Sequence, residues 1–393
     1  MEGFIFARIK KLSKKMKKFS VKGFCLVFAV AFIALNSCSK PKTVATQPVA
    51  QTVNPPVEMA EERGVSAKPI WANAKDSARI AFYNVENLFD TIDEPMTIDS
   101  EYMPNSKLQW TQQRYDAKLK NIAKVVEEMG FPSVMGLVEV ENRRVLNDLT
   151  TKTALKTQNY GIAHFESPDE RGIDCALIYK KADFTVKNAK PHRINFPMDK
   201  ADRTRDILEV SGILRGIAVT VFVNHWPSRS GGAAESAPKR IYVGQVLRRA
   251  VDSLFKTDAN ARVIIMGDLN DDPNDKSVLE GLKAVYWNRD TLPKPIIDKN
   301  AIYDLAAGVK RSGNGSYFFK GEWEVIDQMM VSGSFLDGRS KLVTADAETI
   351  FNADFLTYKD RSGRKLPNRT YTGPIYRGGF SDHFPVYLMV YFK

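Results

Sequence analysis

Short apolar runs with strand-like patterning recur from Arg79 to the C terminus, and segments with helical periodicity separate some of them. The periodicity predicts one helix from the N-cap Thr111 to Gly130 and another over about 239–255. No change in composition divides this region, so the pattern predicts one α/β domain over 76–393. With 44% apolar residues the chain can bury a core, which excludes global disorder. The predicted strands include 79–84, 133–139, 207–214, 217–224, 263–266 and 385–392, with a hairpin turn at Arg215-Gly216.

The first 38 residues carry the features of an export signal. Eight basic residues are followed by an uninterrupted apolar run of twelve residues over 24–35. This run is shorter than the roughly 20 residues that span a bilayer, but it fits the apolar core of a secretory signal. It ends in Leu35-Asn36-Ser37-Cys38, which resembles a bacterial lipobox, in which a lipid-modified cysteine becomes the new N-terminus. We therefore expect a lipoprotein signal peptide over 1–37 and lipidation of Cys38; the alternative is an ordinary signal peptide or a short membrane anchor.

The segment over 38–75 predicts a tether. It is rich in Pro, Thr, Val, Ala and Gln near its start and has neither a helical nor a strand period. Such a composition buries too little surface to offset the entropy of ordering, so we expect a flexible or polyproline-like spacer. Ser39 stands where enteric bacteria place an aspartate to retain lipoproteins in the inner membrane. We therefore expect a cell-envelope protein, lipid-anchored in the outer membrane and facing the periplasm or the surface.

The net charge of +11 is concentrated in the segment that export would remove. Residues 1–37 carry +7, residues 38–75 carry +2, and the remaining 318 residues carry about +2. The total charge therefore gives no argument for a polyanionic partner. Of the three cysteines, Cys25 leaves with the signal and Cys38 is expected to be acylated, so no internal disulfide can form. Cys175 is expected to be a small buried apolar residue.

Polar side chains stand at the ends of the predicted strands. If the strands lie side by side, these groups converge on one rim of the sheets, where they suit a hard divalent cation beside an acid/base pair. Each motif alone is explained as well by a polar turn, a helix cap, a solvated strand end or a hydrogen-bonded core histidine. The six motifs together favour a site. They are Asn84, Glu139, Asn224-His225, Asp268-Leu269-Asn270, Asp327 and Ser381-Asp382-His383.

In this order the motifs resemble those of the endonuclease/exonuclease/phosphatase superfamily, the deoxyribonuclease I-like proteins. The resemblance covers residues 79–393 and is greatest, at 84–90 and 139–142, to the branch that contains secreted bacterial nucleases. It implies an α/β (α+β) fold, a four-layer sandwich of two mixed, mostly antiparallel β-sheets packed face to face with helices outside. The matching residues are Asn84, Gly136-Leu137-Val138-Glu139-Val140, Asn224-His225, Gly267-Asp268-Leu269-Asn270, Ile326-Asp327 and Ser381-Asp382-His383.

The resemblance implies a metal site. Glu139, with Asn84 and Asp382, would hold Mg²⁺ or Mn²⁺, and Ca²⁺ is a further possibility. Carboxylate, amide and water oxygens are the ligands that such a cation prefers. Glu141 is a nearby alternative, but Glu139 occupies the motif position.

The resemblance also implies roles for five catalytic residues. Asp268 would orient or deprotonate the attacking water, and Asn270 would hydrogen-bond a phosphoryl oxygen. Asp327 would pair with His383, fix its tautomer and favour the imidazolium beside phosphate. His225 would donate to a phosphoryl oxygen or protonate the leaving group.

Residues outside the motifs are candidates for substrate binding. Arg205, Ser228 and Arg229 are expected to contact phosphate, because the arginine fork matches phosphate oxygens; a structural or solvated arginine is the equal alternative. Gln328 stands where many relatives carry a histidine or another ring, which bears on substrate preference. In the loop before Ser381, base stacking and simple surface packing are both open for Arg369, Tyr371, Tyr376 and Arg377.

The expected function is that of an exported, lipid-anchored, divalent-metal-dependent phosphodiesterase, a nuclease that hydrolyses DNA or RNA by in-line attack of water. An alternative is a phosphatase or phospholipase-type esterase acting on inositol phosphates or sphingomyelin, because one fold supports all these reactions. A second alternative is a non-catalytic lipoprotein that binds phosphorylated ligands. The expected partners are the substrate and the membrane, and we expect a monomer.

Overall fold

The computed structural model describes residue 70 and residues 73–288, 296–344 and 347–393. The predicted signal peptide, the lipidation site Cys38 and the tether as far as residue 69 lie outside the described residues. No helix within the described part of the chain is long and apolar enough to cross a membrane.

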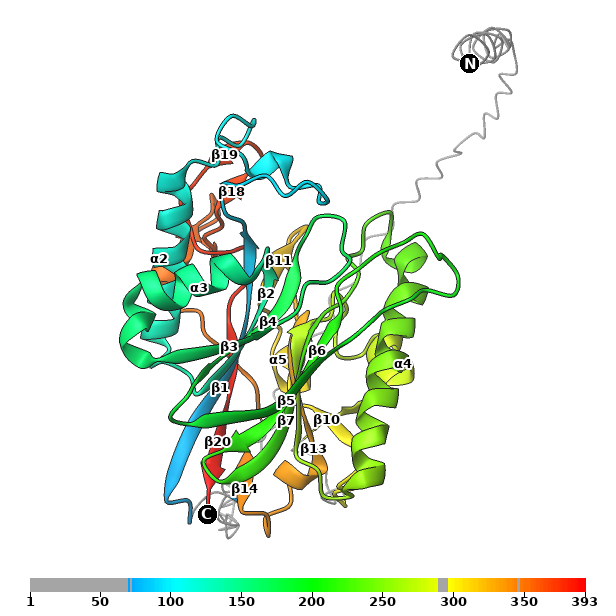
Figure 1. Cartoon of the computed structure of the whole chain (residues 1–393). Coiled ribbons are helices and arrows are strands. Elements are labelled where there is room, and N and C mark those ends of the chain that lie inside the picture. Colours follow the sequence, from blue (N-terminus) through cyan, green and yellow to red (C-terminus); the bar gives the residue numbers. More distant parts are fainter. Residues whose placement is uncertain (1–69, 71–72, 289–295, 345–346) are drawn as a thin grey trace, which may run out of the picture. The chain divides into compact units, whose positions relative to one another are not determined.

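One large sheet is built around β1, which runs parallel to β2 on one side and antiparallel to β20 on the other. The strand order is β14-β20-β1-β2-β4-β3, and β15 also pairs with β20. The C terminus of the chain lies at the end of β20 (Figure 1). The bounds are β1 Asp76–Leu88, β2 Val134–Val140, β3 Tyr160–His164, β4 Asp174–Lys180, β14 Leu342–Thr344, β15 Thr349–Ile350 and β20 Val386–Phe392.

The second large sheet has the order β5-β6-β7-β8-β13-β10-β9. β7 and β8 are parallel, whereas β13 runs antiparallel to β8. The predicted hairpin joins β6 to β7, where Arg215 and Gly216 both take positive φ, as a tight two-residue turn requires. The bounds are β5 Phe184–His192, β6 Ile207–Leu214, β7 Ile217–His225, β8 Val263–Asp268, β9 Val285–Tyr286, β10 Ile302–Asp304 and β13 Asp327–Ser332.

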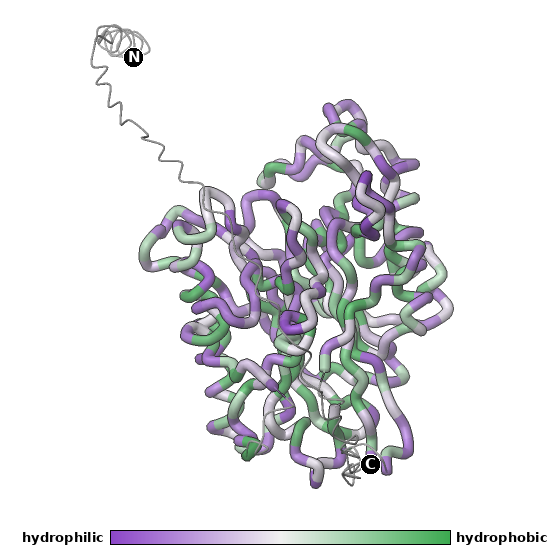
Figure 2. The backbone as a smooth tube through the Cα atoms, turned by 180° about the vertical axis from the view of Figure 1, so that it is seen from behind, coloured by the Kyte–Doolittle hydropathy of each residue, from purple (hydrophilic) through white to green (hydrophobic). Residues whose placement is uncertain are grey.

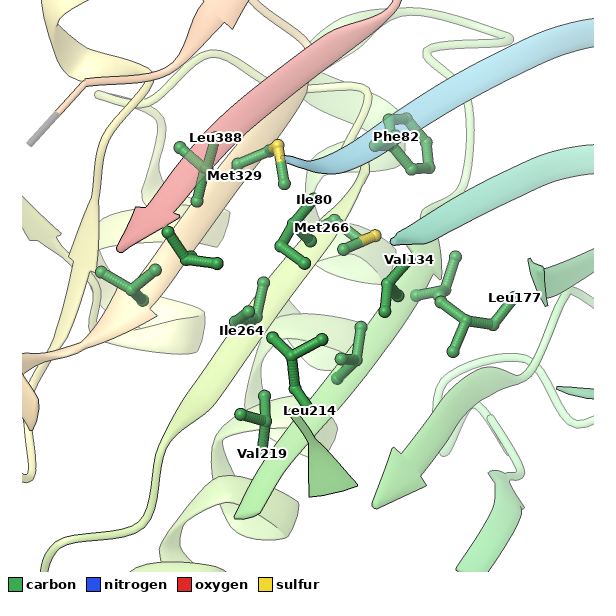
Figure 3. Packing of buried hydrophobic residues seen from close by; sticks show 14 of the residues in the cluster. Ile80, Phe82, Val134, Leu177, Leu214, Val219, Ile264, Met266, Met329 and Leu388 are labelled. Carbon is green, nitrogen blue, oxygen red and sulfur yellow. The ribbon is translucent and has the colours of Figure 1, made fainter. Parts of the chain in front are cut away.

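The two sheets pack face to face, and helices cover their outer faces (Figure 1). Along β1, Ile80 and Phe82 point into the layer between the sheets, whereas Ala81 and Tyr83 point toward the helices, because alternate strand residues face opposite ways. Figure 3 shows the inner layer, to which Ile264 and Met329 contribute from the other sheet. In Figure 2, hydrophobic and hydrophilic stretches alternate along the chain. This confirms the predicted four-layer sandwich.

Helices α2 and α3 cover the sheet around β1, and α4 covers the sheet around β7. α4 begins at Ala233, earlier than predicted, although Pro238 lies inside it. Side chains add hydrogen bonds to this first turn, since Ser236 Oγ donates to the Gly232 carbonyl and Arg240 Nη2 donates to the Ala233 carbonyl. The helical bounds are α2 Gln112–Glu128, α3 Arg143–Lys152, α4 Ala233–Thr257, α5 Ala307–Arg311 and the short turns η1 Ser100–Tyr102, η2 Ala154–Gln158, η3 Ser277–Leu282, η4 Gly333–Phe335 and η5 Asp354–Leu356.

Three two-stranded hairpins complete the described elements. They carry no part of either large sheet, but one of them, β11-β12, lines the site described below. The bounds are β11 Tyr317–Phe319, β12 Glu322–Glu324, β16 Thr357–Lys359, β17 Lys365–Pro367, β18 Tyr371–Thr372 and β19 Ile375–Tyr376.

Candidate active site

The carboxyl ends of β1, β2, β7 and β8 bring the predicted polar residues to one rim. Asn84 is paired in register with the residue before Glu139, and His225 is paired with Asp268. β13 runs the opposite way and starts at this rim, so Asp327 is paired with Asp268. The fold therefore gathers residues that are as much as 299 positions apart on one edge of the sandwich, counting from Asn84 to His383.

Irregular backbone turns Glu139 into this rim. The registers of β2 with both β1 and β4 shift around Glu139, which marks a bulge. Glu139 takes φ 61°, and Glu86, Asn87 and Asn270 near it also have positive φ. Each such conformation costs about 1–3 kcal/mol for a residue other than glycine, and such strain clusters at functional sites. The strain is offset by bonds to the glutamate, since the Asn87 amide donates to Glu139 Oε2 at 3.0 Å.

His383 and Asp327 form a buried ion pair, with His383 Nδ1 2.7 Å from Asp327 Oδ2. Ser316 Oγ donates to the same carboxylate oxygen at 2.5 Å, and the ring of Tyr317 stacks on the imidazole with centroids 4.6 Å apart. Burial by itself would lower the pKa of His383, but the charge and hydrogen bond of Asp327, with Asp382 nearby, raise it well above its usual range. The histidine is therefore held as an imidazolium whose Nε2 is left for other contacts.

Asp268 lies at the centre of the cluster. Its Oδ1 accepts from the Asn270 amide at 2.9 Å, and its Oδ2 accepts from Asn84 Nδ2 at 3.0 Å. The same Oδ2 lies 3.7 Å from His225 Nε2 and 3.9 Å from His383 Nε2. Burial raises the pKa of Asp268 to about 7, against the lowering effect of the His383 charge. A carboxylate with such a pKa is suited to take a proton near neutral pH.

His225 differs from His383 in charge. Burial lowers the pKa of His225 well below its usual range, and the cations Arg205 and Arg171 lower it further. Neutral His225 also lies with Nε2 3.9 Å from Glu139 Oε1. Two imidazoles with opposite protonation states therefore face one carboxylate cluster, which is how acid and base roles become separated.

The donor set fits a divalent cation. Asp268 and Asp327 place carboxylate oxygens within 4.8 Å of one another, and Asn84 Nδ2 donates to Glu139 Oε1 at 3.2 Å and to Asp268 Oδ2 at 3.0 Å. The second oxygen of Asp327 is buried without a hydrogen-bond partner among the described residues. Buried carboxylates crowded in this way need a cation to hold their charge, and hard oxygen ligands match Mg²⁺ or Mn²⁺.

Asp382, the third predicted ligand, lies close to the cluster with Oδ1 3.9 Å from His383 Nε2. Arg369 bridges it to Glu86, since Nη2 contacts Asp382 at 2.9 Å and Nε contacts Glu86 at 3.0 Å. Buried Lys118 holds the same loop through Thr370 Oγ1 at 2.6 Å. This network fixes the loop that carries Asp382. Apart from its place in the 84–90 motif, nothing in the sequence marks Glu86 as part of this network.

Six of the predicted site residues line an open cleft of about 730 Å³; they are Glu139, His225, Asp268, Asn270, Asp382 and His383. Its walls include Tyr317 and Phe319 of β11 and Lys320 at the hairpin turn, and Phe319 is 46% exposed. The position of this hairpin beside His383 cannot be predicted from the motifs, because the pairing of Tyr317 with His383 joins segments far apart in sequence. Glu141 turns away from the cleft and accepts from the Asp90 amide at 2.7 Å.

The predicted substrate residues occupy different positions. Ser228 and Arg229 line the cleft, but Arg229 is held by Glu324 at 2.8 Å and by the Asn270 carbonyl at 2.7 Å. Arg205 is buried behind the cleft, where it contacts Asp169 at 3.0 Å and the Trp226 carbonyl at 2.6 Å. It therefore acts on the site through its charge.

Other loop residues pack against the protein. Gln328 is buried and donates to the carbonyls of Asp271 and Val325. Tyr371 and Tyr376 pack edge to face with centroids 5.3 Å apart, and Arg377 Nε lies 3.4 Å from Thr372 Oγ1. For the tyrosines the structure thus favours packing over base stacking. Arg171, which no motif marks, lines the cleft from the loop before β4.

Several solved structures resemble this fold at low sequence identity. Truncated Caenorhabditis elegans TDP2 is 18% identical with a TM-score of 0.48, and 81% of this chain and 98% of that chain are covered. A mannosyl-6-phosphatase of Bacteroides thetaiotaomicron is 16% identical with a TM-score of 0.49, over 80% and 100%. The human nocturnin catalytic domain is 13% identical with a TM-score of 0.49, over 81% and 95%.

The comparison with curated proteins gives no match. The family model of the endonuclease/exonuclease/phosphatase family matches residues 79–391, which include every motif of the rim. The chain is therefore a member of the endonuclease/exonuclease/phosphatase family, with the fold and the phosphoric ester hydrolase class of that family.

Proposed function

We propose that the protein is a divalent-metal-dependent phosphodiesterase that cleaves nucleic acid. The observation that carries the proposal is the buried cluster in which Asp268 lies between neutral His225 and the charged His383–Asp327 pair. Such a cluster supplies a base, a hydrogen-bond donor and a positive charge within one cleft. These are the groups that hydrolysis of a phosphodiester needs.

The chain's own residues divide the work as follows. Asp268, with its raised pKa, orients the attacking water and accepts its proton. The His383 imidazolium, held by Asp327, donates to a phosphoryl oxygen as negative charge develops there. His225 and Asn270 donate hydrogen bonds to the phosphoryl group or to the leaving oxygen. Mg²⁺ or Mn²⁺, held by Glu139 with Asn84 and Asp382, would supply Lewis acidity that neutralises phosphoryl charge.

The wall of the cleft supports nucleic acid as the substrate. Tyr317 and Phe319 stack with centroids 6.1 Å apart, and Lys320 lies over the Phe319 ring. An exposed ring with a cation beside it suits a base next to the cleaved phosphate, because base stacking on aromatic side chains contributes about 1–3 kcal/mol per base. The near-neutral domain supports a second candidate, a compact phosphoester such as an inositol phosphate, since it lacks a net positive field.

A substrate panel tests the proposal. The domain is incubated with plasmid DNA, single-stranded RNA, inositol phosphates and sphingomyelin, each with Mg²⁺, with Mn²⁺ and with EDTA. We expect metal-dependent cleavage of nucleic acid and none with EDTA. Asp268→Asn serves as the inactive control. Cleavage of inositol phosphates alone would select the second candidate, and hydrolysis of no substrate would leave a ligand-binding protein.

We infer that the protein is exported and anchored by lipid at Cys38. The inference is supported by the basic segment, the apolar run and the lipobox-like sequence before Cys38. The outer membrane is proposed because Ser39 follows the cysteine. In cells expressing the full chain, we expect metabolic incorporation of a labelled fatty acid and recovery in the outer-membrane fraction. Cys38→Ser should lose the label; a labelled Cys38→Ser protein would refute the assignment.

A further inference from the structure

A second pocket of about 470 Å³ adjoins the catalytic cleft. Arg171, Ser228 and Ser230 line both, so the two spaces share a wall. The second pocket extends from this wall to the segment before β6 and to the first turns of α4, where Arg203 and Lys239 line it. None of the three predicted metal ligands and five predicted catalytic residues lines this pocket.

The two spaces differ in charge. Acidic side chains outnumber basic ones in the lining of the catalytic cleft, as a cation site requires. In the second pocket four basic side chains, Arg171, Arg203, Arg205 and Lys239, oppose two acidic ones, Asp202 and Glu235. A cation in the first space and an anion beside it in the second would both be favoured electrostatically.

Two of these cations are available to a ligand. Arg203 is exposed, donates to the carbonyls of Lys200 and Asp202, and makes no ion pair within the described part of the chain. Arg171 is half exposed and lies 3.6 Å from Asp169, a carboxylate already bound by Arg205 at 3.0 Å. Lys239, in contrast, is neutralised by Asp202 at 2.6 Å and Asp199 at 3.4 Å.

The floor of the pocket holds donors without acceptors. Thr204 Oγ1 and Arg205 Nε are buried and have no hydrogen-bond partner among the described residues. Arg205 is only 6% exposed, and its two terminal nitrogens are fixed by Asp169 and Trp226. The guanidinium is therefore fixed in the floor, with its charge paired to Asp169.

We propose that this pocket is a second phosphate subsite, which binds a phosphate of the substrate other than the one being cleaved. The inference rests on the proposed function and narrows its substrate class to phosphoesters with at least two phosphates. A nucleic-acid strand supplies the second phosphate from the next nucleotide, and an inositol polyphosphate supplies it from the ring. Sphingomyelin does not fit, because it has one phosphate and its quaternary ammonium group would meet Arg171 and Arg203.

A binding experiment tests the subsite without catalysis. Inorganic phosphate is added to the protein in EDTA at constant ionic strength, and the midpoint of thermal unfolding is measured. Without metal the catalytic cleft is acidic and repels phosphate, so we expect stabilisation through the second pocket. Arg203→Ala should lose most of that stabilisation. Arg339→Ala, an exposed arginine that lines neither space, is the matched control and should keep it.

A kinetic experiment identifies the source of the phosphate. Dinucleotides with and without a terminal 5′-phosphate, and inositol phosphates with one and two phosphates, are compared in wild type and in both variants. We expect Arg203→Ala to lower the preference in kcat/KM for the second phosphate about tenfold, as loss of a charge-assisted hydrogen bond would. The substrate pair whose preference falls, either the dinucleotides or the inositol phosphates, identifies the source of the second phosphate.

The two experiments distinguish a failure of the proposed function from a failure of the phosphate subsite. If wild type hydrolyses no substrate, the proposed function fails, while the phosphate-induced stabilisation still decides the subsite. If Arg203→Ala and Arg339→Ala show equal stabilisation by phosphate, the subsite is overturned. Equal losses on the one-phosphate and two-phosphate substrates would overturn it as well.

Discussion

At the residue scale, the chemistry depends on neighbours that give side chains of the same type different roles. His225 and His383 have the same side chain, but His383 has a hydrogen-bonded carboxylate and His225 faces two arginines. Asp268 differs likewise from Asp327, because His383 binds Asp327 directly and lies 3.9 Å from Asp268. The roles therefore follow from neighbours in space.

Replacing Asp268 by Asn should separate activity from stability. We expect kcat to fall by about 10²–10⁴-fold, because a base within the cluster is lost. The midpoint of unfolding should stay unchanged or rise, because the buried carboxylate is already held with a raised pKa. His383→Ala should lose activity similarly. Steady-state kinetics and thermal unfolding measure both quantities, with Asp337→Asn, outside the cleft, as control. Full activity of Asp268→Asn would remove Asp268 from the mechanism.

A buried acidic pair should make stability depend on pH. Burial raises the pKa of Asp304 from 3.8 to about 7, and burial with the nearby Asp304 raises the pKa of Glu348 well above its usual 4.5. The folded protein therefore keeps protons that the unfolded chain releases, so stability is full below about pH 4 for this pair and falls as pH rises toward 7 and beyond.

Glu348→Gln replaces one of these protonated carboxyl groups with an amide, which does not titrate. The variant should gain stability relative to wild type at pH 8 and little at pH 4, because Gln keeps an oxygen for the Met329 amide, which Glu348 Oε2 binds at 2.6 Å. Urea unfolding at the two pH values gives the difference. A gain of the same size at both values would show that Glu348 titrates normally.

At the element scale, the parallel pair β7–β8 fixes the site. A Cβ at Gly267 would lie 2.4 Å from the Asn224 carbonyl oxygen, so only glycine allows β8 to approach β7 at this register. That approach places His225 beside Asp268. The bulge on β2 likewise turns the side chain of Glu139 into the rim. Local irregularities, rather than ideal strands, thus aim the functional side chains.

Gly267→Ala tests the close approach. The added methyl group meets backbone, which cannot rotate away, so we expect a loss of stability of about 1–3 kcal/mol and reduced activity. Gly308→Ala in α5 is the matched control, because its Cβ would lie 3.8 Å from the nearest atom. That control should stay within about 1 kcal/mol of wild type. Urea unfolding compares the two, and equal stability would contradict the predicted contact.

At the scale of the whole molecule, the sandwich keeps opposite charges in adjoining spaces. The domain carries only about +2, yet acidic side chains prevail in the catalytic cleft and basic ones in the pocket beside it. The total charge therefore hides the partition that matters for a phosphorylated substrate. We therefore expect divalent cations to stabilise the folded protein by binding in the acidic cleft.

Mg²⁺ or Mn²⁺ should raise the midpoint of thermal unfolding, because binding to the folded state alone stabilises by about 2.7 kcal/mol at 100 times Kd. EDTA should reverse the rise, and Glu139→Gln should weaken it by removing a carboxylate ligand. Differential scanning calorimetry over a metal titration measures the effect. If Glu139→Gln is stabilised as much as wild type, the cation is held by other carboxylates of the rim, such as Asp268 and Asp327.

The sequence by itself determined the main strands and one α/β domain, because apolar periodicity is a local signal. The order of its strand-end motifs resembles that of the endonuclease/exonuclease/phosphatase family, and this resemblance implied the sandwich class and the eight residues of the metal site and catalysis. Only the tertiary structure decided that Tyr317 stacks on His383, that Arg205 is buried behind the site, and that Arg171 borders a second, basic pocket. Those contacts join segments distant in the chain. Their geometry depends on how the two sheets pack, which no local pattern encodes.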